Sequence, residues 1–125
     1  MRNNHSAIPV TDLSIPALFQ QRVNDTPSSP AYHFFDHLKS QWRTLTWAEM
    51  EKRVRHWSAA LDSEEVQPGD RVALMIPNGI NWVCFDLAAQ SRGLIVVPLY
   101  ANDRPENVLY ILEHTRSKLL HCNDP

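Results

Sequence analysis

The stretch of residues 66–99 constrains the fold of this chain more than any other part of its sequence. A Pro-Gly-Asp sequence at 68–70 predicts a turn, because proline fixes one dihedral angle and glycine accepts positive φ. The apolar run 71–76 then predicts a strand that ends at Pro77, since proline cannot donate to a central ladder. Residues 66–76 therefore predict a turn followed by a buried strand.

Residues 80–92 predict a helix that is buried on most of its sides, because apolar residues leave only a narrow polar stripe. Asn78 is a candidate N-cap for this helix, and Gly93 is placed to end it in the left-handed conformation. Residues 94–99 have no polar alternation, which is typical of a strand covered on both sheet faces. The unit is β-α-β, so its two strands are expected to be parallel.

Length and charge exclude several classes of protein. A chain of 125 residues can form one compact domain, and its net charge of −2, with both signs interspersed, provides no basic stripe for nucleic acid. The first residues include no apolar run, and nowhere do about 18 apolar residues follow one another, so we expect no signal peptide and no transmembrane segment. We predict a cytoplasmic protein without a nucleic-acid partner, and peripheral association with a membrane is left open.

The rest of the chain predicts a flexible arm at 1–13 and one partial domain at 14–125, with the order helix, hairpin, β-α-β-α-β. The helix begins near Ser14, and residues 31–35 and 42–45 form the hairpin. Thr46 and Glu49 form a capping box at the start of a second amphipathic helix, and a strand is expected at 118–122. In the helix that precedes this strand, four apolar residues are expected to face the sheet: Val108, Leu109, Ile111 and Leu112.

No catalytic, cofactor-binding or metal site is expected within the chain. Its three glycines, at 69, 79 and 93, form neither a dinucleotide fingerprint nor a phosphate loop, and no serine has a nucleophile-elbow context. The closest groups of metal-ligating residues fall on different predicted elements, which argues against zinc. These groups are His33 with His37, and His114 with His121 and Cys122.

Two further features have simple structural interpretations. Asp103 and Arg104 lie in a loop after the strand 94–99, at the edge where open parallel sheets bind ligands, but a solvated loop pair is the preferred interpretation. Cys84 and Cys122 are interpreted as two reduced, structural thiols, because their spacing resembles no disulfide framework.

Four segments resemble, in order, the opening of adenylate-forming synthetases, a superfamily that includes acyl-CoA synthetases, peptide-synthetase adenylation domains and luciferases. They are LTWAEM at 45–50, VQPGDRVALMIPN at 66–78, RGLIVVPLY at 92–100 and RPENVLYILEHTRSKLL at 104–120. The VPLY ending and the Pro-Glu-Asn helix start are most similar to long-chain fatty-acyl-CoA synthetases. The resemblance implies an α/β fold with parallel-sheet layers and flanking helices, as the incomplete first part of the N-terminal subdomain.

This resemblance implies an AMP-forming ligase that converts a fatty acid to its acyl-CoA through an acyl-adenylate, using ATP, Mg²⁺ and coenzyme A. The family's phosphate loop, its aromatic-Thr-Glu motif, its ribose-binding aspartate and its C-terminal lysine would all follow Pro125. The chain alone is therefore predicted to be inactive and to bind no cofactor. The fatty acid would bind through the downstream regions.

Three positions depart from the family pattern: Glu65 replaces a helix-ending glycine, Arg104 replaces a capping residue and leaves Asp103 to cap, and the sequence turns polar after Leu120. The helix 80–92 is apolar almost all round, so we expect it to need a further layer, which a second sheet supplies in the family. Without that layer the chain would expose an apolar patch and self-associate. The alternative is a stand-alone α/β binding or scaffold module without catalysis.

Overall fold

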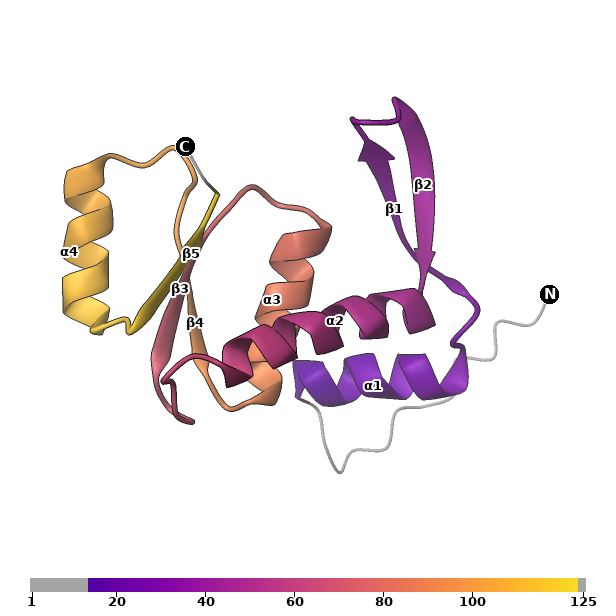
Figure 1. Ribbon diagram of the computed structural model, residues 1–125, viewed down its shortest axis with the longest axis horizontal. Helices are drawn as coiled ribbons and strands as arrows, with labels where there is room; N and C mark the ends of the chain where they lie inside the picture. Colours follow the sequence, from indigo (N-terminus) through magenta and orange to yellow (C-terminus); the bar gives the residue numbers. More distant parts are fainter. Residues whose placement is uncertain (1–13, 124–125) are drawn as a thin grey trace.

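The structure, a computed structural model, describes residues 14–123 (Figure 1). The predicted arm at 1–13 lies outside these residues. The helices are α1 (Ile15–Asp25), α2 (Trp47–Asp62), α3 (Ile80–Ser91) and α4 (Pro105–Thr115). The strands are β1 (Pro30–Asp36), β2 (Gln41–Thr46), β3 (Arg71–Met75), β4 (Ile95–Pro98) and β5 (Leu119–Cys122).

The strands form two separate sheets. β1 and β2 make an antiparallel hairpin, and the other three strands make a parallel sheet in the order β4-β3-β5. In the parallel sheet Val72 of the central strand lies opposite Val96 on one side and Leu119 on the other. The parallel β-α-β unit predicted from residues 66–99 is confirmed.

Helix α3 lies on one side of the parallel sheet, and α4 lies on the other (Figure 1). Five residues of α3 are buried, and the helix contacts α1, α2 and β4. Met50 and Leu61 of α2 contribute to the same core, and Val23 of α1 is also buried. The sequence predicts a further layer over α3, and in this structure two amphipathic helices of the same chain supply that layer, whereas the family resemblance implied a second sheet.

Two sequence predictions about burial are corrected at the outer elements. β4 is not covered on both faces, because 52% of Ile95 is exposed. In α4, Leu109 is 57% exposed and does not face the sheet, whereas Val108, Ile111 and Leu112 are half-buried. Periodicity places residues on a helical face, but it does not show how much of that face a neighbour covers.

The predicted helix ends agree with the structure except at the starts of α3 and α4. The hydroxyl of Thr46 accepts from the amide of Glu49 at 3.2 Å, and the Glu49 carboxylate accepts from the amide of Thr46 at 2.8 Å, which completes the capping box. Gly93 follows α3 with φ of 73°, as predicted. Asn78 does not cap α3; the N-cap is Gly79, which makes no side-chain cap bond.

Replacing Thr46 by alanine is expected to lower the free energy of unfolding by about 1 kcal/mol, because the amide of Glu49 loses its acceptor. Thr46→Ser keeps the hydroxyl and serves as the matched control. Urea denaturation followed by circular dichroism measures both variants. Equal stabilities for the alanine and serine variants would contradict the role of the cap.

Candidate functional site

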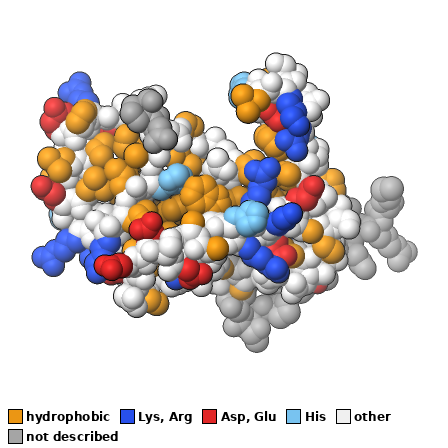
Figure 2. Space-filling view, viewed as in Figure 1, with side chains coloured by type: hydrophobic (Ala, Val, Ile, Leu, Met, Phe, Trp, Pro, Cys, Tyr) orange, Lys and Arg blue, Asp and Glu red, His pale blue; other side chains and the backbone are white. Residues whose placement is uncertain are grey.

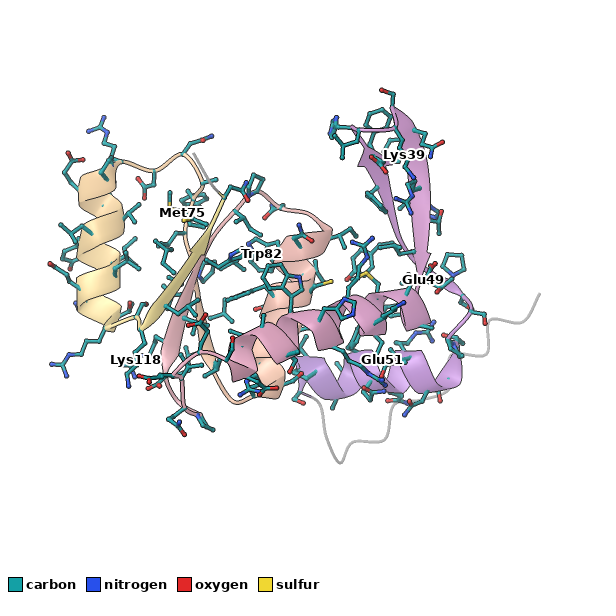
Figure 3. The ribbon with its side chains drawn as sticks, viewed as in Figure 1. Lys39, Glu49, Glu51, Met75, Trp82 and Lys118 are labelled. Carbon is teal, nitrogen blue, oxygen red and sulfur yellow. The ribbon has the colours of Figure 1, made fainter. Side chains whose placement is uncertain are left out.

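A shallow groove lies at the carboxyl ends of β3 and β4, the edge at which the sequence places a ligand-side loop. Its volume is about 390 Å³. Trp82 of α3 forms part of its wall and is labelled in Figure 3, which also shows Met75 at the end of β3. The remaining lining residues are Ile76, Pro77, Asn78, Pro98, Leu99, Tyr100 and Ala101.

The loop 100–104 borders this groove. The amide of Asp103 donates to the carbonyl of Tyr100 at 3.1 Å, which closes a turn, and Tyr100 is 82% exposed. The Asp103 carboxylate accepts from the Arg104 amide at 2.8 Å and from the Asn107 side chain at 2.9 Å. Arg104, not Asp103, is the N-cap of α4, and it makes no side-chain cap bond. Asp103 therefore holds the loop against the first turn of α4.

The lining of the groove is more apolar than polar. The amide of Asn78 and the phenol of Tyr100 are its polar side-chain groups. One oxygen of the Asp103 carboxylate, Oδ1, accepts both the bond from Arg104 and the bond from Asn107 of α4. Such a surface is suited to holding an apolar group.

The first histidine group lies in the hairpin. The ring of His33 shares a hydrogen bond of 2.7 Å with the hydroxyl of Thr44, across the two strands. His37 lies in the turn and contacts the ring of Phe35, with the ring centres 5.0 Å apart. Each of these rings thus has a local structural contact.

The second group is divided between α4 and β5. His114 stacks on Tyr110 within α4, whereas the adjacent His121 and Cys122 belong to β5. Among residues 14–123, no three histidine, cysteine, aspartate or glutamate side chains come close enough together to hold a metal ion.

His121 belongs to an aromatic cluster that sequence reasoning missed, because the sequence does not show which distant rings meet across α2, α3 and β5. Its ring centre lies 4.8 Å from that of Trp57 and 5.2 Å from that of Phe85. The cluster borders a second cavity, of about 330 Å³, between α2, α3 and β5. Burial lowers the pKa of His121, because the charged ring would lose hydration there.

This shift predicts a pH dependence of stability. Because the pKa of His121 is lowered in the folded chain, the unfolded chain takes up the proton first as the pH falls through about 6.5. The contribution of His121 to folding is therefore present above that pH and is lost below it. The free energy of unfolding should decline from about pH 7 to pH 5, and His121→Phe should reduce the decline while keeping the ring contacts.

Urea titrations of the parent chain and of His121→Phe at the two pH values measure this difference. The other histidines are common to both proteins, so the comparison isolates His121. An equal decline in the two proteins would show that His121 does not contribute to the pH dependence.

The two cysteines differ in environment. Cys84 is buried in α3, and this burial raises the pKa of its thiol to about 11, so it is a poor nucleophile and part of the core. Cys122 is exposed at the end of β5. The interpretation of both as structural thiols therefore fits Cys84, whereas Cys122 does not contribute to the core.

The fold and the apolar groove define an α/β scaffold built on a parallel sheet. A search of protein families matches residues 19–124 to the AMP-binding enzyme family. The chain belongs to this family.

Curated relatives and solved structures agree with this assignment. The chain is 38% identical over 99 residues to the long-chain-fatty-acid–AMP ligase FadD26 of Mycobacterium tuberculosis, which covers 74% of this chain and 16% of that protein. It is also 38% identical over 76 residues to a 3-[(3aS,4S,7aS)-7a-methyl-1,5-dioxo-octahydro-1H-inden-4-yl]propanoyl:CoA ligase of Rhodococcus jostii, covering 61% of this chain and 15% of the relative. The chain thus spans about a sixth of the length of these relatives.

Among solved structures, a fatty acyl CoA synthetase of M. tuberculosis matches with a TM-score of 0.74 and 26% identity, over 84% of this chain and 20% of that chain. The N-terminal subdomain of NpsA from Klebsiella oxytoca has the same fold, with a TM-score of 0.79 and 22% identity, over 90% of this chain and 27% of that chain. Within residues 14–123, no helix has the length and apolar character that crossing a membrane requires.

Proposed function

We propose that this chain is the structural opening of an ATP-dependent ligase that activates a fatty acid as its acyl-adenylate and then transfers the acyl group to coenzyme A. The observation that carries this proposal is the 38% identity to a long-chain-fatty-acid–AMP ligase over 99 residues. Formation of the adenylate is the part that both kinds of relative support. Transfer to coenzyme A is supported by the relatives that are named CoA ligases.

In this proposal the chain contributes architecture rather than chemistry. In the part of the chain that the structure describes, no three histidine, cysteine, aspartate or glutamate side chains come together and the groove at the strand ends is mostly apolar, so we assign no Mg²⁺-ATP site to these residues. ATP, Mg²⁺, coenzyme A and the fatty acid would be bound by other regions of a longer protein. The described residues would supply the parallel sheet and its covering helices as a rigid support.

The test begins with the gene on the 3′ side of the codon for Pro125. If the reading frame continues, the longer protein is expressed and assayed for AMP, pyrophosphate and acyl-CoA with a panel of fatty acids. We expect AMP formation that depends on the fatty acid, with acyl-CoA appearing only when coenzyme A is added. The 125-residue chain is the matched control and should form no AMP.

The possible results separate the two parts of the proposal. Acyl-adenylate that accumulates without acyl-CoA would overturn the transfer step and leave an acid–AMP ligase. A longer protein that forms no AMP with any fatty acid, or a frame that stops after Pro125, would overturn the ligase assignment.

The second candidate is a stand-alone α/β binding module, and it is favoured by the way α1 and α2 bury α3 within this chain. A single cooperative unfolding transition of a monomer would support this module. A broad transition with self-association would instead support a partial domain that needs further layers. Exposed apolar residues at which such association could occur are Ile95 of β4 and Leu109 and Tyr110 of α4.

A further inference from the structure

We propose that the tip of the β1–β2 hairpin, residues 35–43, docks on membranes that contain anionic lipid and inserts its apolar side chains among the lipid headgroups. The hairpin projects away from the helices and the parallel sheet (Figure 1). Its base is fixed by Leu45, which is buried in the core, and by Tyr32, which packs against it. Because its base is fixed in this way, the hairpin holds its tip away from the helices and the parallel sheet.

Large apolar side chains are concentrated at this tip. Leu38 in the turn is 98% exposed, Trp42 on β2 is 74% exposed and Phe35 on β1 is 39% exposed. The rings of Phe35 and Trp42 make an edge contact, with their centres 5.7 Å apart, which places the two aromatic side chains on the same face. Figure 2 shows hydrophobic and basic side chains side by side at the end of the hairpin.

Three polar groups of the tip are already hydrogen-bonded to one another, which lowers the free-energy cost of moving them into a less polar environment. One oxygen of the Asp36 carboxylate accepts from the turn amides of Leu38 and Lys39, at 3.1 and 3.2 Å. Its other oxygen accepts from the Arg43 guanidinium at 3.1 Å, and the Asp36 side chain is only 13% exposed. Two turn amides and one negative charge are thus paired within the tip, so they need not lose water on docking.

The remaining charge favours an anionic surface. Because Arg43 balances Asp36, the exposed Lys39 gives the tip an excess positive charge, and Figure 3 shows Lys39 on the hairpin, far from the other labelled side chains. An exposed tryptophan beside a lysine is the combination found at membrane interfaces, where the indole lies at headgroup level and the amine reaches the aqueous side. A protein partner would need roughly 20 residues on each side, more than this narrow tip presents.

Vesicle binding tests the proposal on the full 125-residue chain. Vesicles of phosphatidylcholine with phosphatidylserine are sedimented with the protein, and vesicles of phosphatidylcholine alone serve for comparison. We expect Leu38→Ala to weaken binding to the mixed vesicles about fivefold or more, because an inserted side chain is lost. Lys39→Gln should weaken it by about fivefold on the mixed vesicles only.

The matched control is Leu109→Ala, an exposed leucine on α4 at the opposite end of the molecule, which should leave binding unchanged (Figure 1). Brominated lipids should quench the fluorescence of the bound parent chain, and Trp42→Phe should remove most of that quenching. Circular dichroism verifies that each variant folds. A protein sample without vesicles separates membrane binding from self-association.

Three results would overturn the proposal. Leu38→Ala could bind as well as the parent chain, Leu109→Ala could weaken binding as much as Leu38→Ala, or the quenching could persist in Trp42→Phe. The same Leu38→Ala comparison in a longer protein, if the gene encodes one, tests whether another region covers the tip. No effect there would overturn membrane docking for the whole protein, whatever its enzymatic activity.

Discussion

Replacing Leu74 by alanine is expected to lower the free energy of unfolding by about 3–4 kcal/mol, because a fully buried leucine leaves a cavity as well as losing its transfer free energy. Leu74 has no exposed surface and lies in β3, the central strand of the parallel sheet. Its register partners are Pro98 on β4 and His121 on β5. Hydrogen-bonded neighbours on both sides hold this part of the backbone, so it cannot easily close the cavity.

The matched control is Leu38→Ala, the same substitution at a side chain that is 98% exposed, for which we expect a change of less than about 0.5 kcal/mol. Urea denaturation monitored by tryptophan fluorescence measures both. If the chain with Leu74→Ala does not fold, Leu74→Met, with a similar volume and a cost of less than about 1.5 kcal/mol, provides the second measurement. Equal losses at the two leucines would contradict the burial of β3.

Replacing Gly93 by serine is expected to cost about 1–3 kcal/mol. Gly93 has φ of 73°, in the left-handed region that side chains other than glycine adopt only with strain. A Cβ atom at this position would also lie 3.2 Å from the Cβ of Pro68, so the turn before β3 would have to shift. The amide of Gly69 donates to the carbonyl of Gly93 at 2.8 Å, which couples the two turns.

Gly79→Ser is the matched control for this prediction. Gly79 has an extended backbone, an added Cβ would meet nothing within 4 Å, and serine is a preferred N-cap residue. We therefore expect Gly79→Ser to leave the stability unchanged or to raise it slightly. Thermal unfolding of the two serine variants compares them directly, and a larger loss at Gly79 than at Gly93 would refute the argument from backbone conformation.

The local elements of this fold were predictable because their signals lie within a few residues of one another. Thr46 and Glu49 satisfy each other's backbone donors three residues apart, and Gly93 takes the conformation that ends a helix. Arg55 pairs with Glu51 at 2.6 Å, as the spacing of four predicts. An arginine also lies four residues after Glu49, but the carboxylate of Glu49 accepts from the amide of Thr46, a bond within the same turn.

The sequence predicted where the candidate site lies but not all of the residues that line it. The sequence located a loop at the carboxyl end of the strand 94–99, and the structure confirms this position beside the groove at the ends of β3 and β4. That Trp82 from α3 would form a wall of the same groove did not follow from the sequence, because this depends on how the helix is rotated over the sheet. The contacts of His121 with Trp57 and Phe85 likewise join three elements that are distant in sequence.

The sequence by itself determined the order of the helices and strands, most of their ends, the parallel β-α-β unit and the family, because caps, turns and motif spacings are properties of short segments. Tertiary structure alone decided which apolar faces are covered. It placed α1 and α2 over α3, left Ile95 and Leu109 exposed and directed the hairpin tip into solvent. The physical reason is that burial depends on which distant surfaces meet, and a periodic pattern records only that a face is apolar.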